Sequence, residues 1–221
     1  GVKPVMWSPV EKTALAEAEI EYHDHVSTTI FARFPIKKAP LELLNDYEII
    51  IWTTTPWTMP GNRAVAYGKD IDYSLLEITS VSENSLAKIG DKIVVANQLL
   101  EEAIKELSIS NYNVSKKLKG SDFEGSILAH PLNGYGYDHD VLLLEADFVT
   151  TEQGTGFVHI APGHGADDFE LGKKHNLPIP ETVSDNGILD NELPSLGGLR
   201  VLKDNDKIAD IMSQQNALIR R

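Results

Sequence analysis

The sequence has 221 residues, 42% of them hydrophobic and 24% charged, which is the composition of a globular protein with one or at most two domains. Lysine and arginine total 20 against 33 aspartate and glutamate residues, giving a formal charge of −13. This charge argues against a generic nucleic-acid binder, because non-specific affinity depends on neutralising phosphates. The absence of cysteine excludes disulfides, thiolate nucleophiles and cysteine-ligated zinc.

The first half of the chain predicts a series of short strands. Residues 15–36 alternate polar and apolar side chains, so we expect an extended strand there. The run YEIIIWT, rich in β-branched residues, predicts a buried strand. Further strands are predicted at residues 63–67, 72–79 and 92–95.

The second half predicts strands with three helices. Asn97 is expected to cap a helix over 99–108, which has an apolar stripe at helical spacing. Charges that complement the helix dipole predict a short helix over 163–176, and apolar spacing predicts a last helix over 204–218. Strands are expected at 111–120, 141–150 and 151–161, with one strand at best between 120 and 140. We therefore expect a mainly β, α+β fold: a closed or nearly closed β-barrel with peripheral helices.

A hydroxyl-rich loop follows the buried strand, in the stretch WTTTPWTMPGNRA. Pro56 and Pro60 predict a loop rather than a strand, because proline gives no N–H to a sheet ladder. Threonine hydroxyls and an asparagine amide on a stiff loop can orient a water, a ribose or a carbonyl. The alternative is a threonine-rich strand end without a ligand. The side chains concerned are Thr53, Thr54, Thr55, Trp57, Thr58 and Asn62.

A second constellation lies in GTGFVHIAPGHGADD, residues 154–168. A strand carries His159, and a helix begins near His164 with Asp167 and Asp168 in its first turn. One aspartate suffices to complement the helix dipole, so the other is free to face a ligand cation such as an α-ammonium group. His159, His164 and an aspartate are also possible metal ligands, although their spacing matches no metal motif. Gly154 and Gly156 match part of the dinucleotide-binding motif GxGxxG, but its third glycine is missing, so we do not expect a dinucleotide site.

Neither constellation contains a nucleophile paired with a base. There is no GxSxG motif and no cysteine, and threonine needs an adjacent base to act as a nucleophile. The residues therefore favour a hydrolysis that positions water over one that passes through a covalent enzyme.

IIIWTTTPWTMPGNRAVA together with GTGFVHIAPGHGADDF resembles the editing domain of isoleucyl-tRNA synthetase, the insertion called connective polypeptide 1. The resemblance covers nearly the whole chain and implies one domain, residues 1–221, cut from a larger cytoplasmic synthetase. It implies a β-barrel that hydrolyses the ester of mischarged Val-tRNA(Ile). Some relatives bind zinc through cysteines near Trp7; here Ser8 and Pro9 stand instead, so we expect neither metal nor cofactor.

The resemblance also implies roles for the side chains. Asp168 matches the aspartate that pairs with the α-ammonium group, and His159 matches the histidine that bounds the side-chain pocket and refuses isoleucine. Trp57 either stacks on the adenine or packs beneath the loop. Predicted catalytic residues are Asp168, Thr54, Thr55 and His159, and predicted substrate-binding residues are Thr53, Trp57, Thr58, Asn62 and His164.

The expected partners are the 3′ end of tRNA(Ile) carrying valine and the remainder of the synthetase chain, with no membrane. The acidic balance fits this expectation, since only a single-stranded end of the tRNA reaches the domain. Two other readings remain: a module that binds aminoacyl ends without hydrolysing them, and a metal-dependent hydrolase built on His159, His164 and an aspartate.

Overall fold

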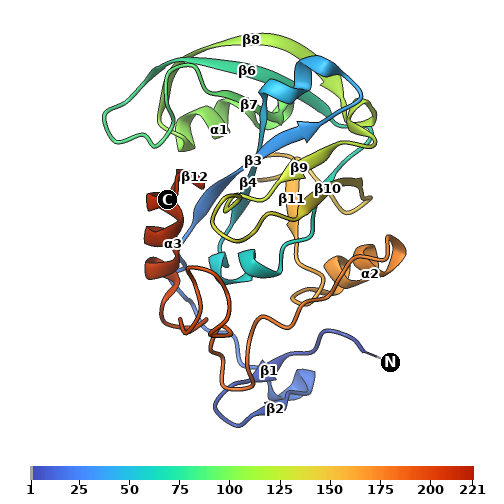
Figure 1. Ribbon diagram of the computed structural model, residues 1–221, viewed down its shortest axis with the longest axis vertical. Coiled ribbons are helices and arrows are strands. Elements are labelled where there is room, and N and C mark those ends of the chain that lie inside the picture. Colours follow the sequence, from blue (N-terminus) through green and yellow to red (C-terminus); the bar gives the residue numbers. More distant parts are fainter. Residues whose placement is uncertain (1) are drawn as a thin grey trace.

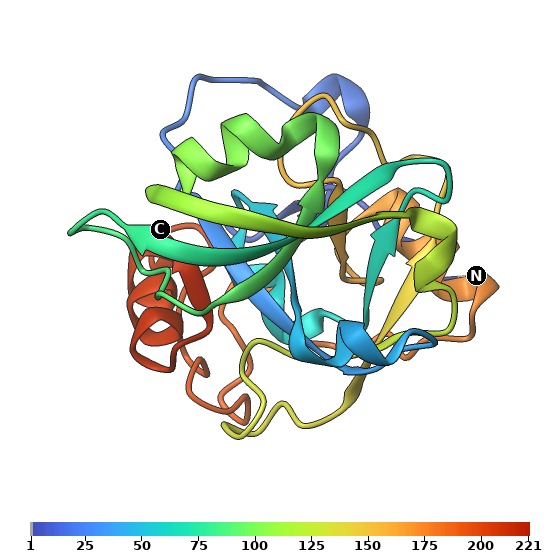
Figure 2. The same ribbon diagram turned by 90° about the horizontal axis from the view of Figure 1, so that it is seen from above.

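The computed structural model describes residues 2–221. Ten strands form one large mixed sheet, and two short strands form a separate hairpin, β1–β2, at the bottom of Figure 1. Viewed from above, the long strand β8 crosses the molecule with α1 beside it (Figure 2). The strands are β1 (Trp7–Ser8), β2 (Thr13–Ala14), β3 (Ile30–Lys38), β4 (Glu48–Thr53), β5 (Ala64–Tyr67), β6 (Asp72–Val81), β7 (Lys92–Ala96), β8 (Ile109–Lys119), β9 (Ile127–Ala129), β10 (Asp140–Glu145), β11 (Phe157–Ile160) and β12 (Leu218–Arg220).

The helices are short and lie around the sheet. In Figure 1, α2 and α3 lie on the right and left of the body, and α1 lies near the top beside β6, β7 and β8. The α-helices are α1 (Leu100–Glu106), α2 (Ala166–Lys174) and α3 (Asn205–Gln214), and the 3₁₀ helices are η1 (Glu17–Glu19), η2 (Glu42–Asp46), η3 (Pro56–Gly61), η4 (Asn97–Leu99) and η5 (Gly120–Phe123).

The large sheet is open. Its strand order is β11-β5-β10-β9-β3-β4-β7-β6-β8, with β12 paired to β3, and the edge strands β11 and β8 do not pair with each other within residues 2–221. The prediction of a closed or nearly closed β-barrel was therefore wrong, whereas the mainly β, α+β content was right. Strand β8 is mostly exposed and carries Lys116, Lys117 and Lys119, and such a charged edge resists pairing with a further strand.

Strand β4 leads directly to the hydroxyl-rich loop and is buried on both faces. Ile49 and Ile51 belong to the main hydrophobic core, whereas Ile50 belongs to a second cluster that packs beneath α1. Alternate residues of a strand point to opposite faces, so both faces need an apolar partner layer. This burial fixes the end of β4, and with it the start of the loop.

Several sequence predictions need local correction. Residues 20–29 form no regular element, and the expected strand begins only at Ile30, after the 3₁₀ turn η1. Asn97 does not cap α1; its Oδ1 accepts a hydrogen bond from the hydroxyl of Ser74 at 2.8 Å. The last helix ends at Gln214, and the chain then returns to the sheet as β12. In each case a tertiary contact or turn replaced the element that local pattern favoured.

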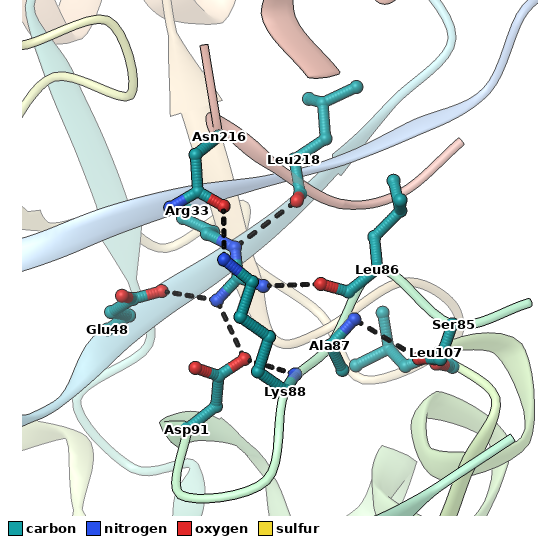
Figure 3. A network of polar contacts seen from close by, with 10 residues as sticks. All are labelled: Arg33, Glu48, Ser85, Leu86, Ala87, Lys88, Asp91, Leu107, Asn216 and Leu218. Carbon is teal, nitrogen blue, oxygen red and sulfur yellow. Dashed lines mark hydrogen bonds and ion pairs between the residues drawn. The ribbon is translucent and has the colours of Figure 1, made fainter. Parts of the chain in front are cut away.

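A buried charged network joins strands that are far apart in the sequence (Figure 3). Arg33 on β3 is only 4% exposed. Its guanidinium donates to Glu48 at 3.1 Å, to Asp91 at 3.0 Å, and to the carbonyls of Leu86 and Leu218 at 2.9 and 3.2 Å. This Arg33 network ties β3 to β4, to the turn before β7 and to β12.

Within residues 2–221, no helix combines the length and the apolar character needed to cross a membrane.

Candidate functional site

The hydroxyl-rich loop is a tight turn followed by a 3₁₀ helix. As β4 ends, the Thr53 hydroxyl accepts the backbone N–H of Thr55 at 3.1 Å, and the chain bends at Thr54. Pro56 is the first residue of η3. Proline suits this position because the first N–H groups of a helix have no partner within the helix, so the N–H that proline lacks is not needed. The Thr58 hydroxyl donates back to the Thr55 carbonyl at 2.8 Å. The loop is therefore held by its own threonines, and η3 brings Thr58 inward.

The second constellation forms the opposite wall. Strand β11 pairs antiparallel with β5, and His159 lies opposite Val65. After a turn, α2 begins at Ala166 with Asp168 in its first turn. Asp168 Oδ2 accepts the backbone N–H of Ala161 at 2.8 Å, so the aspartate is anchored to the turn that precedes its own helix.

The two walls line an open cavity of about 210 Å³. Its lining joins the end of β4, the hydroxyl-rich loop, β11 and the start of α2, although these segments lie about a hundred residues apart in the sequence. We call it the threonine cavity. It is lined by Trp52, Thr53, Thr55, Thr58, Val158, His159, Ala161, His164 and Asp168.

His159 is bonded at both ring nitrogens. Its Nε2 lies 2.8 Å from the Thr58 hydroxyl, and its Nδ1 lies 2.7 Å from the side-chain amide nitrogen of Asn62. Asn62 is fully buried, and its amide also donates to the carbonyl of Ala64 at 2.9 Å. The two walls are thereby tied together through one imidazole.

The threonine cavity is lined by two neutral histidines and one carboxyl group. Burial lowers the pKa of His159 to about 3, with the neighbouring His164 adding to the effect, and burial also lowers the pKa of His164. Both rings are therefore neutral at pH 7. Burial raises the pKa of Asp168 against the opposing hydrogen bond from Ala161, and no Lys, Arg or His within the described residues forms an ion pair with it. The cavity thus presents a carboxylate without a partner cation.

Comparison with known proteins connects this geometry to one family. The family described as "Leucyl-tRNA synthetase, editing domain" matches residues 71–196, more than half of the chain. Isoleucine–tRNA ligase of Gluconobacter oxydans (strain 621H) is 49% identical over 216 residues, and that of Pelagibacter ubique (strain HTCC1062) is 47% identical over 219 residues. The alignments cover 97% and 99% of this chain but 22% and 24% of those ligases.

The chain belongs to the family of aminoacyl-tRNA synthetase editing domains. The resemblance to the isoleucyl editing domain is therefore confirmed, and the chain spans between a fifth and a quarter of its curated relatives' length. The crystal structure of GlLeuRS-CP1 shares the fold, with a TM-score of 0.65 at 14% identity, over 87% of this chain and 98% of that one.

Six of the nine predicted site residues of this editing domain line the threonine cavity, and three do not. Thr54 is exposed and is not among the lining residues. Trp57 packs against the main core and meets His164 edge to face, with ring centroids 4.9 Å apart, so the structure favours packing beneath the loop. Asn62 lies behind His159. The lining residues are Thr53, Thr55, Thr58, His159, His164 and Asp168.

Sequence reasoning missed Trp52 as part of the cavity wall. It is the last aromatic residue of β4 and directly precedes the three threonines, so its position at a strand end beside a functional loop was a usable signal. Its ring rests near Gly154, where an added Cβ would lie 3.7 Å from the indole. Val158 and Ala161 were also missed, since small apolar residues on a strand carry no distinctive pattern.

The glycines of the GTG stretch serve the fold of the editing domain. Gly156 has a φ of +83°, and an added Cβ would lie 2.4 Å from the Cβ of Ala96. Between the glycines, Thr155 donates to the Ile50 carbonyl at 2.6 Å. The stretch therefore fastens β11 to β4 and β7.

Gly61, at the end of η3, permits the close approach of His164. An added Cβ would lie 3.1 Å from His164 Nε2, which is tighter than an ordinary van der Waals contact. The same nitrogen lies 3.1 Å from the Thr182 hydroxyl. The identity of residue 61 therefore bears on the position of a cavity wall. Within residues 2–221, no three His, Asp or Glu side chains converge in a way that could hold a metal ion.

Proposed function

We propose that this chain is the editing domain of an isoleucyl-tRNA synthetase and hydrolyses the ester of mischarged Val-tRNA(Ile). The observation that carries the proposal is the lone carboxylate of Asp168 in a cavity otherwise lined by neutral side chains. An aminoacyl ester carries one cation, its α-ammonium group, and a charge-assisted hydrogen bond to a carboxylate holds such a group in register.

Such a domain would correct the attachment of valine to tRNA(Ile), an error that arises because a binding pocket discriminates only weakly between side chains that differ by one methylene group. A missing methylene is worth only about 1–3 kcal/mol in an apolar pocket, a general magnitude for which isoleucine and valine are the standard example. A second cavity that admits valine and refuses isoleucine removes the error by size. In our proposal His159, held rigidly at both nitrogens, is the part of the wall that refuses the larger side chain.

The remaining lining groups suit a terminal ribose and an attacking water. Three threonines, Thr53, Thr55 and Thr58, line the cavity on one side. A water held in attacking geometry against an activated ester gains a large effective molarity without a covalent step. A role for Thr54 in this step stays a prediction, as do the valine-charged 3′ end of tRNA(Ile) and the remaining synthetase chain as partners.

The proposal is tested by hydrolysis of Val-tRNA(Ile) and Ile-tRNA(Ile) by the full-length synthetase that carries this domain. We expect rapid release of valine and slow release of isoleucine, and His159→Ala should raise the rate for isoleucine. Saturable binding of a non-hydrolysable valyl-adenosine analogue without any release of valine from Val-tRNA(Ile) would leave the alternative, a non-catalytic binding module. Unchanged discrimination in His159→Ala would move the size filter to another residue.

A further inference from the structure

Asn62 is clamped at its backbone and at its amide nitrogen. Its N–H donates to the Met59 carbonyl at 3.1 Å, and its own carbonyl accepts from Arg63 at 2.6 Å, with His139 Nε2 3.0 Å away. Its amide nitrogen donates to the carbonyl of Ala64 as well as to His159. Because a carbonyl only accepts, the amide nitrogen and not the oxygen must face Ala64 and His159.

This orientation settles which nitrogen of His159 carries the hydrogen. The amide of Asn62 donates to Nδ1, so Nδ1 must hold a lone pair. On the other side, the single hydrogen of the Thr58 hydroxyl is directed to the Thr55 carbonyl, so this oxygen accepts from Nε2–H. Two independent hydrogen bonds thus select the same neutral form of the ring, with its hydrogen on Nε2.

A second histidine supports Asn62 from behind. His130 is fully buried, and its Nδ1 accepts the N–H of Leu132 at 3.0 Å, so its hydrogen lies on Nε2. That hydrogen is donated at 2.9 Å to the Met59 carbonyl, which also receives the N–H of Asn62. The ring itself is stacked on Tyr137 at a centroid distance of 4.9 Å. His130 therefore fixes the end of η3 from which the Asn62 side chain projects.

We infer that Asn62 and His130 are positioning residues of the editing site, which hold His159 in its Nε2–H form and thereby direct the Thr58 hydroxyl onto the Thr55 carbonyl. The inference rests on the proposed function for its catalytic meaning, but its geometry concerns the free protein. It also has a chemical consequence. Neither nitrogen of His159 is left to accept a proton from the attacking water, so His159 shapes the cavity and does not act as the base.

The form of the His159 ring can be measured without any substrate. In the 221-residue chain labelled with ¹⁵N-histidine, the chemical shifts and couplings of both ring nitrogens distinguish the two neutral forms from the imidazolium. His159→Gln identifies the signal of His159 among the seven histidines of the chain. We expect a protonated Nε2 and an unprotonated Nδ1. A protonated Nδ1 in the wild-type chain overturns the inference, even if Val-tRNA(Ile) is hydrolysed.

The same signals should not change between about pH 7.5 and 5. Protonation would place a hydrogen on Nδ1 against the amide hydrogens of Asn62, and burial opposes the added charge. His164 and Asp168 share the cavity with His159. The charged or titratable groups behind it are His130, His139 and Arg63. Titration of His159 near its ordinary pKa would contradict the inference that its ring is held in the neutral Nε2–H form.

Paired substitutions at residue 130 test the positioning role. His130→Gln keeps an N–H donor for the Met59 carbonyl, His130→Phe removes it, and His25→Phe is the control at an exposed position. In the full-length synthetase, we expect His130→Phe to lower kcat for valine release by up to about 100-fold with little change in KM, since small misplacements of reacting groups are costly. His130→Gln should recover most of this loss.

The two experiments distinguish a failure of the positioning role from a failure of the proposed function. If a folded His130→Phe variant keeps both the wild-type ring signals of His159 and the wild-type kcat, His130 has no positioning role. If no variant, the wild type included, releases valine, the proposed function fails, and the ring signals alone then decide whether the Nε2–H form is locked. If His130→Phe does not fold, Asn62→Asp provides the second test, because a carboxylate facing Nδ1 should draw the hydrogen to that nitrogen.

Discussion

Two buried polar networks in this protein differ in charge. The Arg33 network is charged: one guanidinium bonds two carboxylates and two backbone carbonyls. The network at His159 is neutral, and joins Asn62 and Thr58 through one imidazole. The charged network connects strands away from the threonine cavity, whereas the neutral one forms part of the cavity wall. Beside this neutral wall, Asp168 is the one acidic side chain among the residues that line the threonine cavity.

Removing the centre of the charged network should give the largest effect on stability. Arg33→Met leaves Glu48 and Asp91 partly buried without their cation, and stranding buried charges in this way costs about 3 kcal/mol or more. Urea denaturation at pH 7 measures the loss. The matched control is Lys37→Met, which breaks an exposed pair with Asp140 and should cost less than about 1 kcal/mol. Equal losses in the two variants would remove the distinction.

Acid should act on the two networks with opposite signs. Burial lowers the pKa of His130 and His159 to about 3, so between pH 3 and their ordinary value near 6.5 the unfolded chain binds more protons than the folded one. The free energy of unfolding should therefore fall, as pH falls through this window, by roughly 1.4 kcal/mol per pH unit for each histidine. Burial raises the pKa of Glu48 despite its bond to Arg33, so its own contribution rises as pH falls.

Urea denaturation at a series of pH values between about 7.5 and 4.5 measures the balance. Stability should decrease overall toward low pH, because the four histidines whose pKa burial lowers, His130, His139, His159 and His164, outnumber the carboxyl groups whose pKa burial raises, Glu48 and Asp168. His130→Gln should make the dependence shallower, since it removes one of these histidines. A slope unaffected by this substitution would mean that His130 is not a source of the acid sensitivity.

Asp168→Asn removes the one charge that the neutral wall leaves exposed to ligand. Hydrogen bonds to charged groups are worth roughly 1.5–3 kcal/mol, so kcat/KM for valine release should fall by roughly 10- to 150-fold. Stability should not decrease, because the amide oxygen can still accept the N–H of Ala161 and no buried charge remains. The neighbouring exposed Asp167→Asn is the control and should resemble the wild type. Equal rates in the two variants would remove Asp168 from the proposed ammonium site.

The smallest effect is expected from Gly61→Ala, which moves the wall without removing any bond. The added methyl group lies 3.1 Å from His164 Nε2, so the ring must shift by a few tenths of an ångström. We expect a loss of stability below about 1 kcal/mol and a change in KM larger than the change in kcat. A crystal structure of the variant with His164 unmoved would show that this wall does not depend on residue 61.

The sequence by itself determined the elements and the neighbourhood of the site. Runs such as YEIIIWT and VLLLE have the β-branched and apolar content of buried strands, and β4 and β10 form there. The charges of α2 suit its dipole, and the helix forms with Asp168 in its first turn. These outcomes depend mainly on residues close together in the chain, which is why local pattern sufficed.

Only the tertiary structure decided the rest. Whether the sheet closes depends on two edge strands meeting, and alternation within each strand is the same in an open sheet and in a barrel. The partners of His159 lie 97 and 101 residues away, so no local pattern names them. His130 lies in a turn-rich stretch with no motif, and its place behind Asn62 follows from the packing of β9 and η3. Hydrogen bonds select directions in space, and the order of residues does not fix those directions until the chain has folded.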